Sequence, residues 1–113
     1  MPNLRKVGRD GEDAAANFLM DKGYTIVTRR FSARSGELDL VALDGDELVF
    51  VEVKVRNTSE YVPEEAVGPK KLLRLRRAAD VYLNETSEQA RAHRFDIIAI
   101  DQTGIRHHER VFL

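Results

Sequence analysis

Residues 37–55 read ELDLVALDGDELVFVEVKV and hold two largely apolar runs, at 37–43 and 47–55. The connecting Asp44-Gly45-Asp46 predicts a hairpin turn, because glycine accepts the positive φ that a tight turn between two strands requires. The second run is apolar on both faces at residues 48–51, which is typical of a central strand that is covered on both sides. These residues therefore predict the middle of a β-sheet.

The rest of the chain predicts two helices and three more strands around this hairpin. An amphipathic helix is expected from Leu4 to Lys22, because apolar and small residues recur on one side of a helical wheel, and Gly23 suits its end. A second helix is expected from Pro69, which fits a first helical turn, to about Glu85. β-Branched and aromatic content predicts strands at residues 24–31, 95–100 and 105–113. The expected order is helix, three strands, helix, two strands.

Composition predicts a single domain spanning residues 1–113. The 18 Lys and Arg residues nearly balance the 19 Asp and Glu residues, so no overall basic field points to a histone-like protein. The absence of cysteine excludes disulfide frameworks and thiolate metal sites. Residues 1–13 are polar, and no apolar run approaches the roughly 20 residues that cross a bilayer. A cytoplasmic protein without membrane contact is expected.

The hairpin predicts that two carboxylates converge. Strand alternation places Glu37 with Asp39 on one face and Glu52 with Lys54 on another strand's face. If the turn closes with a two-residue loop at 44–45, or with a four-residue loop at 43–46, Asp39 faces the residue at position 50 and Glu37 faces Glu52. Asp39 and Glu52 are then diagonal neighbours, roughly 7 to 8 Å apart at their Cα atoms. Such a pair can bind a hard divalent cation, which would suit phosphodiester hydrolysis.

The residues alone leave two interpretations open. A Glu-x-Lys pattern on a strand is usually a solvated pair worth well under about 1 kcal/mol. Glu52 and Lys54 instead follow an apolar run, where charged groups rarely lack a partner or a purpose.

Glu12 lies at the border of the first helix's apolar stripe, so it either reaches over the sheet or is an ordinary surface acid. His107 and His108 point to opposite faces of their strand, so no shared metal is expected there.

Short motifs follow one another in a fixed order along nearly the whole chain. They are Gly8-Arg9-Asp10-Gly11-Glu12, Gly36-Glu37-Leu38-Asp39, Val49-Phe50-Val51-Glu52-Val53-Lys54, Val67 with Lys71, and Arg94-Phe95-Asp96-Ile97-Ile98. Together they resemble the YraN family of small bacterial proteins. That family is similar in turn to the restriction endonuclease-like, PD-(D/E)XK superfamily, and especially to archaeal Holliday-junction resolvases. The resemblance implies an α/β fold with a mixed central β-sheet flanked by helices.

The resemblance also implies roles for individual residues. Asp39, Glu52 and Val53 would be the metal-binding positions for Mg²⁺ or Mn²⁺. Lys54 would be the catalytic lysine, and Glu12 would be the acidic residue that resolvase-like proteins carry on the first helix. The two carboxylates Asp39 and Glu52 would also be catalytic.

Glu37 and the residues shortly before the Gly36-Glu37 motif bear on hydrogen bonding and substrate contact. Glu37 could hydrogen-bond Lys54 or a loop. YraN proteins often carry asparagine where this chain has Arg30, and a second arginine where it has Ser32. These departures bear on substrate contact and leave the expected metal-binding positions untouched.

The implied function is a metal-dependent DNA endonuclease that acts on branched or structured DNA. Basic residues expected to contact DNA phosphates, unless they are ordinary surface charges, are Arg30, Arg34, Lys70, Lys71 and Arg74. The alternative function is a catalytically silent nucleic-acid-binding or adaptor domain that keeps the nuclease fold. A homodimer could form through the apolar tail Val111-Phe112-Leu113, or that tail could pack on its own core.

Overall fold

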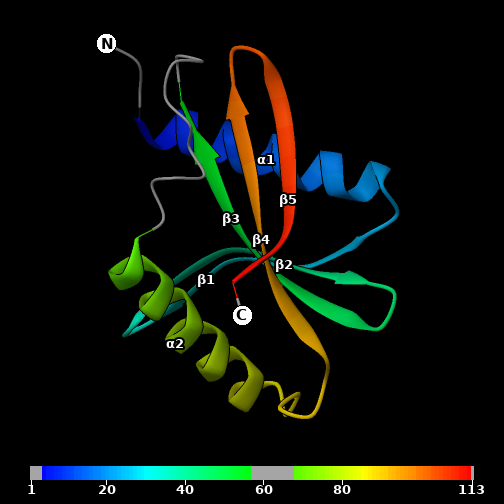
Figure 1. Cartoon of the computed structure of the whole chain (residues 1–113), viewed down its shortest axis with the longest axis vertical. Coiled ribbons are helices and arrows are strands. Elements are labelled where there is room, and N and C mark those ends of the chain that lie inside the picture. The colour runs from blue at the N-terminus through cyan, green and yellow to red at the C-terminus, as the bar shows by residue number, and fades with distance from the viewer. Residues whose placement is uncertain (1–3, 57–67, 113) are drawn as a thin grey trace.

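The computed structural model describes residues 4–56 and 68–112, without the side chains of residues 4–9 and 112. Its elements are α1 (Leu4–Asp21), β1 (Thr25–Ala33), β2 (Gly36–Asp44), β3 (Glu47–Val55), α2 (Pro69–Glu85), β4 (His93–Asp101) and β5 (Gly104–Phe112) (Figure 1). The expected α/β class and element order are confirmed. No helix in these ranges is long and apolar enough to span a bilayer.

The five strands form one mixed sheet in the order β1-β2-β3-β4-β5, with β3 at its centre. β3 and β4 are parallel, and the other neighbouring strands are antiparallel. Val49 and Val51 of β3 pack with α1, whereas Phe50 packs with α2, so the helices cover opposite faces (Figure 1). The expectation of a central strand covered on both sides is therefore confirmed.

The β2–β3 hairpin turns one residue later than expected. Asp44 pairs with Glu47, so the loop is 45–46 rather than 44–45, and Gly45 takes φ +61° at its first position. A two-residue hairpin loop accepts glycine at its first position when only that residue needs a positive φ. Phe50 consequently pairs with Val41, and the expected pairings of Asp39 with Phe50 and of Glu37 with Glu52 were wrong.

Two glycines let the helices approach the sheet beside the candidate site. A Cβ at Gly36 would lie 2.9 Å from the backbone oxygen of Arg74 in α2. A Cβ at Gly11 would overlap the side chain of Val55 at the end of β3. Both glycines belong to the motifs that resemble YraN proteins, and close backbone approach gives each a physical role.

The expected dimer contact falls largely outside the described residues. The side chain of residue 112 and all of residue 113 are not described, and Val111 is half-buried at the end of β5. Homodimer formation through this tail therefore stays a prediction.

Candidate active site

The candidate site lies where β2 and β3 part. The backbone pairing of these strands ends at Leu40 opposite Val51. Beyond it, the Val53 N–H donates to Oδ2 of Asp39 at 2.8 Å, so a side chain takes the place of a backbone acceptor. This bond fixes the Asp39 carboxylate between the strands, beside Glu52. Val53 itself can offer a cation only its backbone carbonyl oxygen.

Burial and a neighbouring acid raise the pKa of Asp39 from 3.8 to about 7. Burial contributes most, because removing a charged carboxylate from water costs free energy. Glu52 adds to the rise through its charge and a hydrogen bond, and Glu12 adds a further contribution, while the bond from Val53 acts in the opposite direction. Two carboxyl groups held this close form an arrangement that a divalent cation would relieve.

Glu52 is buried, and its carboxylate forms ion pairs with two lysines. Its Oε1 lies 3.1 Å from Nζ of Lys54 on the same strand and 2.9 Å from Nζ of Lys71 on α2. The side chain of Lys54 is 13% exposed, whereas that of Lys71 is 44% exposed. Burial lowers the pKa of Lys71, but the ion pair with Glu52 outweighs this effect and the pKa is raised. The structure thus places Lys71 on an expected metal-binding acid.

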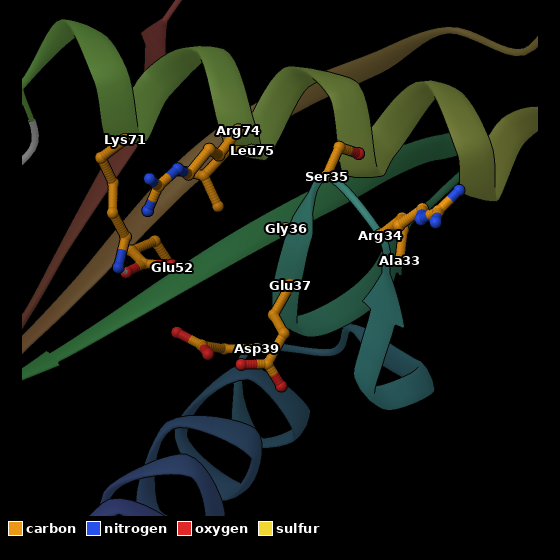
Figure 2. Close-up of a pocket in the computed structure, with 10 residues that line it drawn as sticks. All are labelled: Ala33, Arg34, Ser35, Gly36, Glu37, Asp39, Glu52, Lys71, Arg74 and Leu75. Atoms are coloured by element: carbon orange, nitrogen blue, oxygen red, sulfur yellow. Dashed lines mark ion pairs between the residues drawn. The ribbon is translucent and has the colours of Figure 1, made fainter.

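A pocket of about 440 Å³ opens over these groups, between the β1–β2 turn and α2 (Figure 2). Its charged and polar lining residues are Arg34, Ser35, Glu37, Asp39, Glu52, Lys71 and Arg74, and the others are Ala33, Gly36 and Leu75. Figure 2 shows the Lys71 ammonium against Glu52, with Arg74 reaching over the same part of the pocket. The pocket therefore combines two close carboxylates with cationic side chains that suit a phosphate.

Glu12 lies near this pocket without lining it. Its Oε2 is 2.6 Å from Nε of Arg30, and its charge contributes to the raised pKa of Asp39. Arg30 has φ +55°, a conformation that asparagine adopts more readily than most residues. Arg30, expected to contact DNA, is thus engaged by an acid of the candidate site.

The other expected residues divide between the pocket and the outer surface. Arg34 and Arg74, which are expected to contact DNA phosphates, both line the pocket. Lys70 is exposed on α2 and is not among the lining residues. Glu37 accepts a hydrogen bond from the Ser32 hydroxyl at 3.2 Å, so among the described residues its partner lies on β1 and is not Lys54. The loop that follows residue 56 lies outside the described residues, so a bond from Glu37 to that loop stays a prediction.

A second polar network surrounds the buried Arg94 of β4. Its guanidinium donates to the side chains of Tyr24, Asp44, Glu47, Asp96 and Glu109. Oδ2 of the fully buried Asp96 also lies 2.8 Å from Nε2 of His107. No pattern considered in the sequence predicted a role for this network. The available signal was Arg94-x-Asp96, which places two charges at alternate positions of an otherwise apolar strand.

The network includes a group that could hold a metal. Asp96, His107 and Glu109 bring ligand atoms within 4.8 Å of one another. Burial raises the pKa of Asp96, but hydrogen bonds from His107 and Arg94 outweigh this effect and lower it. Arg94 already donates to both Asp96 and Glu109, so a cationic side chain is already paired with two of these three possible ligands. We therefore interpret this network as a charged tie between the strands.

Comparison with known proteins assigns this chain to one protein family. Residues 11–100 match the family described as "Uncharacterised protein family UPF0102". The chain is 47% identical to a UPF0102 protein of Symbiobacterium thermophilum over 98 residues, 86% of this chain and 83% of that protein. It is 44% identical to a UPF0102 protein of Pelotomaculum thermopropionicum, over 99% of this chain and all of that protein. The resemblance to YraN proteins is thereby confirmed, and the chain belongs to the UPF0102 (YraN) family.

Proposed function

We propose that this protein is a metal-dependent endonuclease that hydrolyses phosphodiester bonds in DNA, with branched or structured DNA as its substrate. One observation carries the proposal: Asp39 and Glu52 lie together in the wall of one pocket, and burial with the charge of Glu52 raises the pKa of Asp39 to about 7. The proposal includes membership of the restriction endonuclease-like superfamily, which would account for the order Asp39, Glu52, Lys54.

The donor set fits a hard divalent cation. Asp39, Glu52 and the Val53 carbonyl would supply oxygen ligands, which Mg²⁺ and Mn²⁺ prefer. A cation held there would polarise a phosphate and lower the pKa of a water molecule. Two carboxylates are also the number that Mg²⁺ commonly takes from a protein, because it keeps several water ligands.

The surrounding side chains would bind and orient the substrate. Arg34 and Arg74 line the pocket and can donate to phosphate oxygens, which positions the DNA backbone without reading its sequence. Lys54, held 3.1 Å from Glu52, can orient the attacking water or offset charge on the phosphate. Glu52 therefore has two tasks in this proposal, metal binding and the placement of Lys54.

The test is a cleavage screen of labelled linear, flap, fork and four-way DNA with Mg²⁺ and with Mn²⁺. We expect the wild type to cut at least one substrate only when the metal is present. Asp39→Asn and Glu52→Gln should each lower the rate by more than the roughly 10- to 100-fold that loss of an outer metal partner costs. Asp101→Asn is the matched control, because it removes one acid of β4 that does not line the pocket.

Other outcomes of the screen would point elsewhere. Undiminished cleavage by both Asp39→Asn and Glu52→Gln would rule out the assigned site. DNA binding without cleavage of any substrate, and without heat on titration of either metal, would favour the silent nucleic-acid-binding or adaptor domain.

A further inference from the structure

Two ammonium groups share one oxygen of Glu52. Nζ of Lys54 and Nζ of Lys71 lie 3.1 Å and 2.9 Å from the same Oε1. One lysine would already neutralise this carboxylate, and two like charges on one oxygen repel each other. One of the two ion pairs therefore contributes less stabilisation than the other, and a competing cation can replace that lysine more easily.

Lys71 is the lysine that can leave. Its side chain is 44% exposed, against 13% for Lys54, so its ammonium regains water at little cost. Lys71 lines the pocket together with Arg74, which lies one helical turn further along α2. An ammonium released from Glu52 would stay in the pocket, next to a guanidinium that faces the same space (Figure 2).

We propose that Lys71 is a built-in counter-ion of Glu52 that a divalent cation displaces, and that the displaced ammonium then contacts a DNA phosphate. The inference rests on the proposed function, since it needs a cation at Asp39 and Glu52. It makes DNA affinity dependent on metal through a single side chain. Without metal the ion pair holds Lys71 on Glu52, and with metal the same lysine adds to the phosphate-binding surface.

Lys70 provides a matched control for charge. It neighbours Lys71 on α2, carries the same charge and is exposed, but it does not line the pocket. Calorimetric titration with Ca²⁺, which binds oxygen donors with looser geometry than Mg²⁺, measures metal affinity in the absence of DNA. We expect Lys71→Ala to bind Ca²⁺ about two- to fivefold more tightly than Lys70→Ala, the range of a partly exposed ion pair.

DNA binding supplies the second readout. Fluorescence anisotropy of a labelled four-way junction, with EDTA or with Ca²⁺, gives the gain in affinity that the metal produces. The ratio of DNA affinity with Ca²⁺ to that with EDTA should be about two- to fivefold smaller for Lys71→Ala than for Lys70→Ala, since a partly exposed ion pair has that strength. With Ca²⁺ present, the DNA affinity of Lys71→Ala should depend less steeply on salt concentration than that of the wild type, by the equivalent of about one phosphate contact.

Breaking the pair from the other side tests the same exchange without metal. Glu52→Gln should raise DNA affinity in EDTA more than Glu37→Gln does, although both remove one acid from the pocket wall. The excess should vanish when Lys71 is also replaced by alanine. An equal rise in both variants would overturn the inference.

The remaining outcomes separate this inference from the proposed function. Equal Ca²⁺ affinities, or equal metal-dependent gains in DNA affinity, for Lys71→Ala and Lys70→Ala overturn the counter-ion role and leave cleavage at Asp39 and Glu52 standing. The absence of Ca²⁺ binding in every variant overturns the inference, and loss of metal-dependent cleavage in the substrate screen would overturn the proposed function separately.

Discussion

The Asp39 carboxyl links the candidate site to the stability of the fold. Its pKa is about 7 in the folded chain, raised chiefly by burial and by Glu52, against 3.8 for an ordinary aspartate. Below about pH 4 both states hold the proton, and above about pH 7 neither does. Between these limits only the folded chain keeps it, so the contribution of Asp39 makes the free energy of unfolding fall as the pH rises.

Asp39→Asn should remove this fall, because an amide does not ionise. We expect the variant to exceed the wild type in free energy of unfolding by up to about 4 kcal/mol at pH 8, and by much less at pH 5. Urea unfolding at both pH values measures the difference in the absence of divalent metal. Parallel pH dependence of the two proteins would contradict the expected role of burial.

Asp101 gives a control of opposite sign. Hydrogen bonds from Thr103 and Arg106 lower its pKa from 3.8 to about 2. Its stabilising contribution is therefore present above about pH 4 and is lost as the pH falls through about 2. Asp101→Asn should be less stable than the wild type by the same amount at pH 5 and pH 8.

The β1–β2 turn and α2 form the walls of the pocket because one glycine allows them to touch. Gly36→Ala would place a Cβ 2.9 Å from the Arg74 backbone oxygen, and a helix backbone cannot yield as a flexible side chain can. We expect a loss of about 1–3 kcal/mol in stability and weaker metal binding, since α2 carries Lys71 and Arg74 away from Glu52. Thermal unfolding and Ca²⁺ calorimetry measure both effects.

Gly68→Ala tests whether any new methyl group near α2 is harmful. Gly68 precedes the helix with φ −86°, and a Cβ there would meet no atom of the described residues within 4 Å. We expect its stability to fall by only about 0.5–1 kcal/mol, because alanine is a poorer N-cap than glycine, and its metal affinity to stay that of the wild type. Equal losses in Gly36→Ala and Gly68→Ala would show that the close approach to Arg74 is unimportant.

Local chemistry explains which elements could be predicted from the sequence. The double-sided apolar run at 48–51 and Pro69 at the first turn of α2 each reflect their own neighbours in the chain, and both expectations are confirmed. The hairpin register depends on whether Gly45 is the first or second loop residue, and both positions accept glycine. Pattern alone therefore could not decide it.

The candidate site was predictable in its composition and not in its contacts. Asp39 and Glu52 lie together even though the expected register was wrong, because the strands part and Asp39 bonds to Val53. The pairing of Lys71 with Glu52 joins residues on different elements, which no periodicity of one element encodes. The same holds for Arg94, which has partners on three other strands and at Tyr24 before β1.

At the scale of the whole molecule, the near-zero net charge hides two acidic groups with different counter-ions. Glu52 carries lysines at the surface of a pocket, and one of them is readily exposed to solvent. Asp96 pairs with an arginine whose side chain is 4% exposed. Burial lowers the pKa of Arg94, but its hydrogen bonds to Asp96, Glu47 and Asp44 outweigh burial and raise the pKa above its usual range. A divalent cation can compete with the exposed lysine far more easily than with the buried guanidinium.

Metal binding should therefore stabilise the fold through the first group. A cation that binds only the folded chain adds roughly 2.7 kcal/mol at 100 times its dissociation constant, which raises the unfolding temperature of a domain this size by several degrees. Differential scanning fluorimetry with Mn²⁺ should show this rise for the wild type and little of it for Asp39→Asn. The rise should persist in Glu109→Gln, which removes one possible ligand of the second group.

The Glu109 variant decides between the two groups because its side chain is 52% exposed and lies at the edge of the Arg94 network. Its loss leaves Arg94 with three other carboxylates, so the fold should survive and the comparison stays meaningful. A rise that Glu109→Gln abolishes and Asp39→Asn retains would place the metal with Asp96 and His107, on the face that α1 covers. The opposite pattern would place it in the pocket beside α2, where the proposed chemistry requires it.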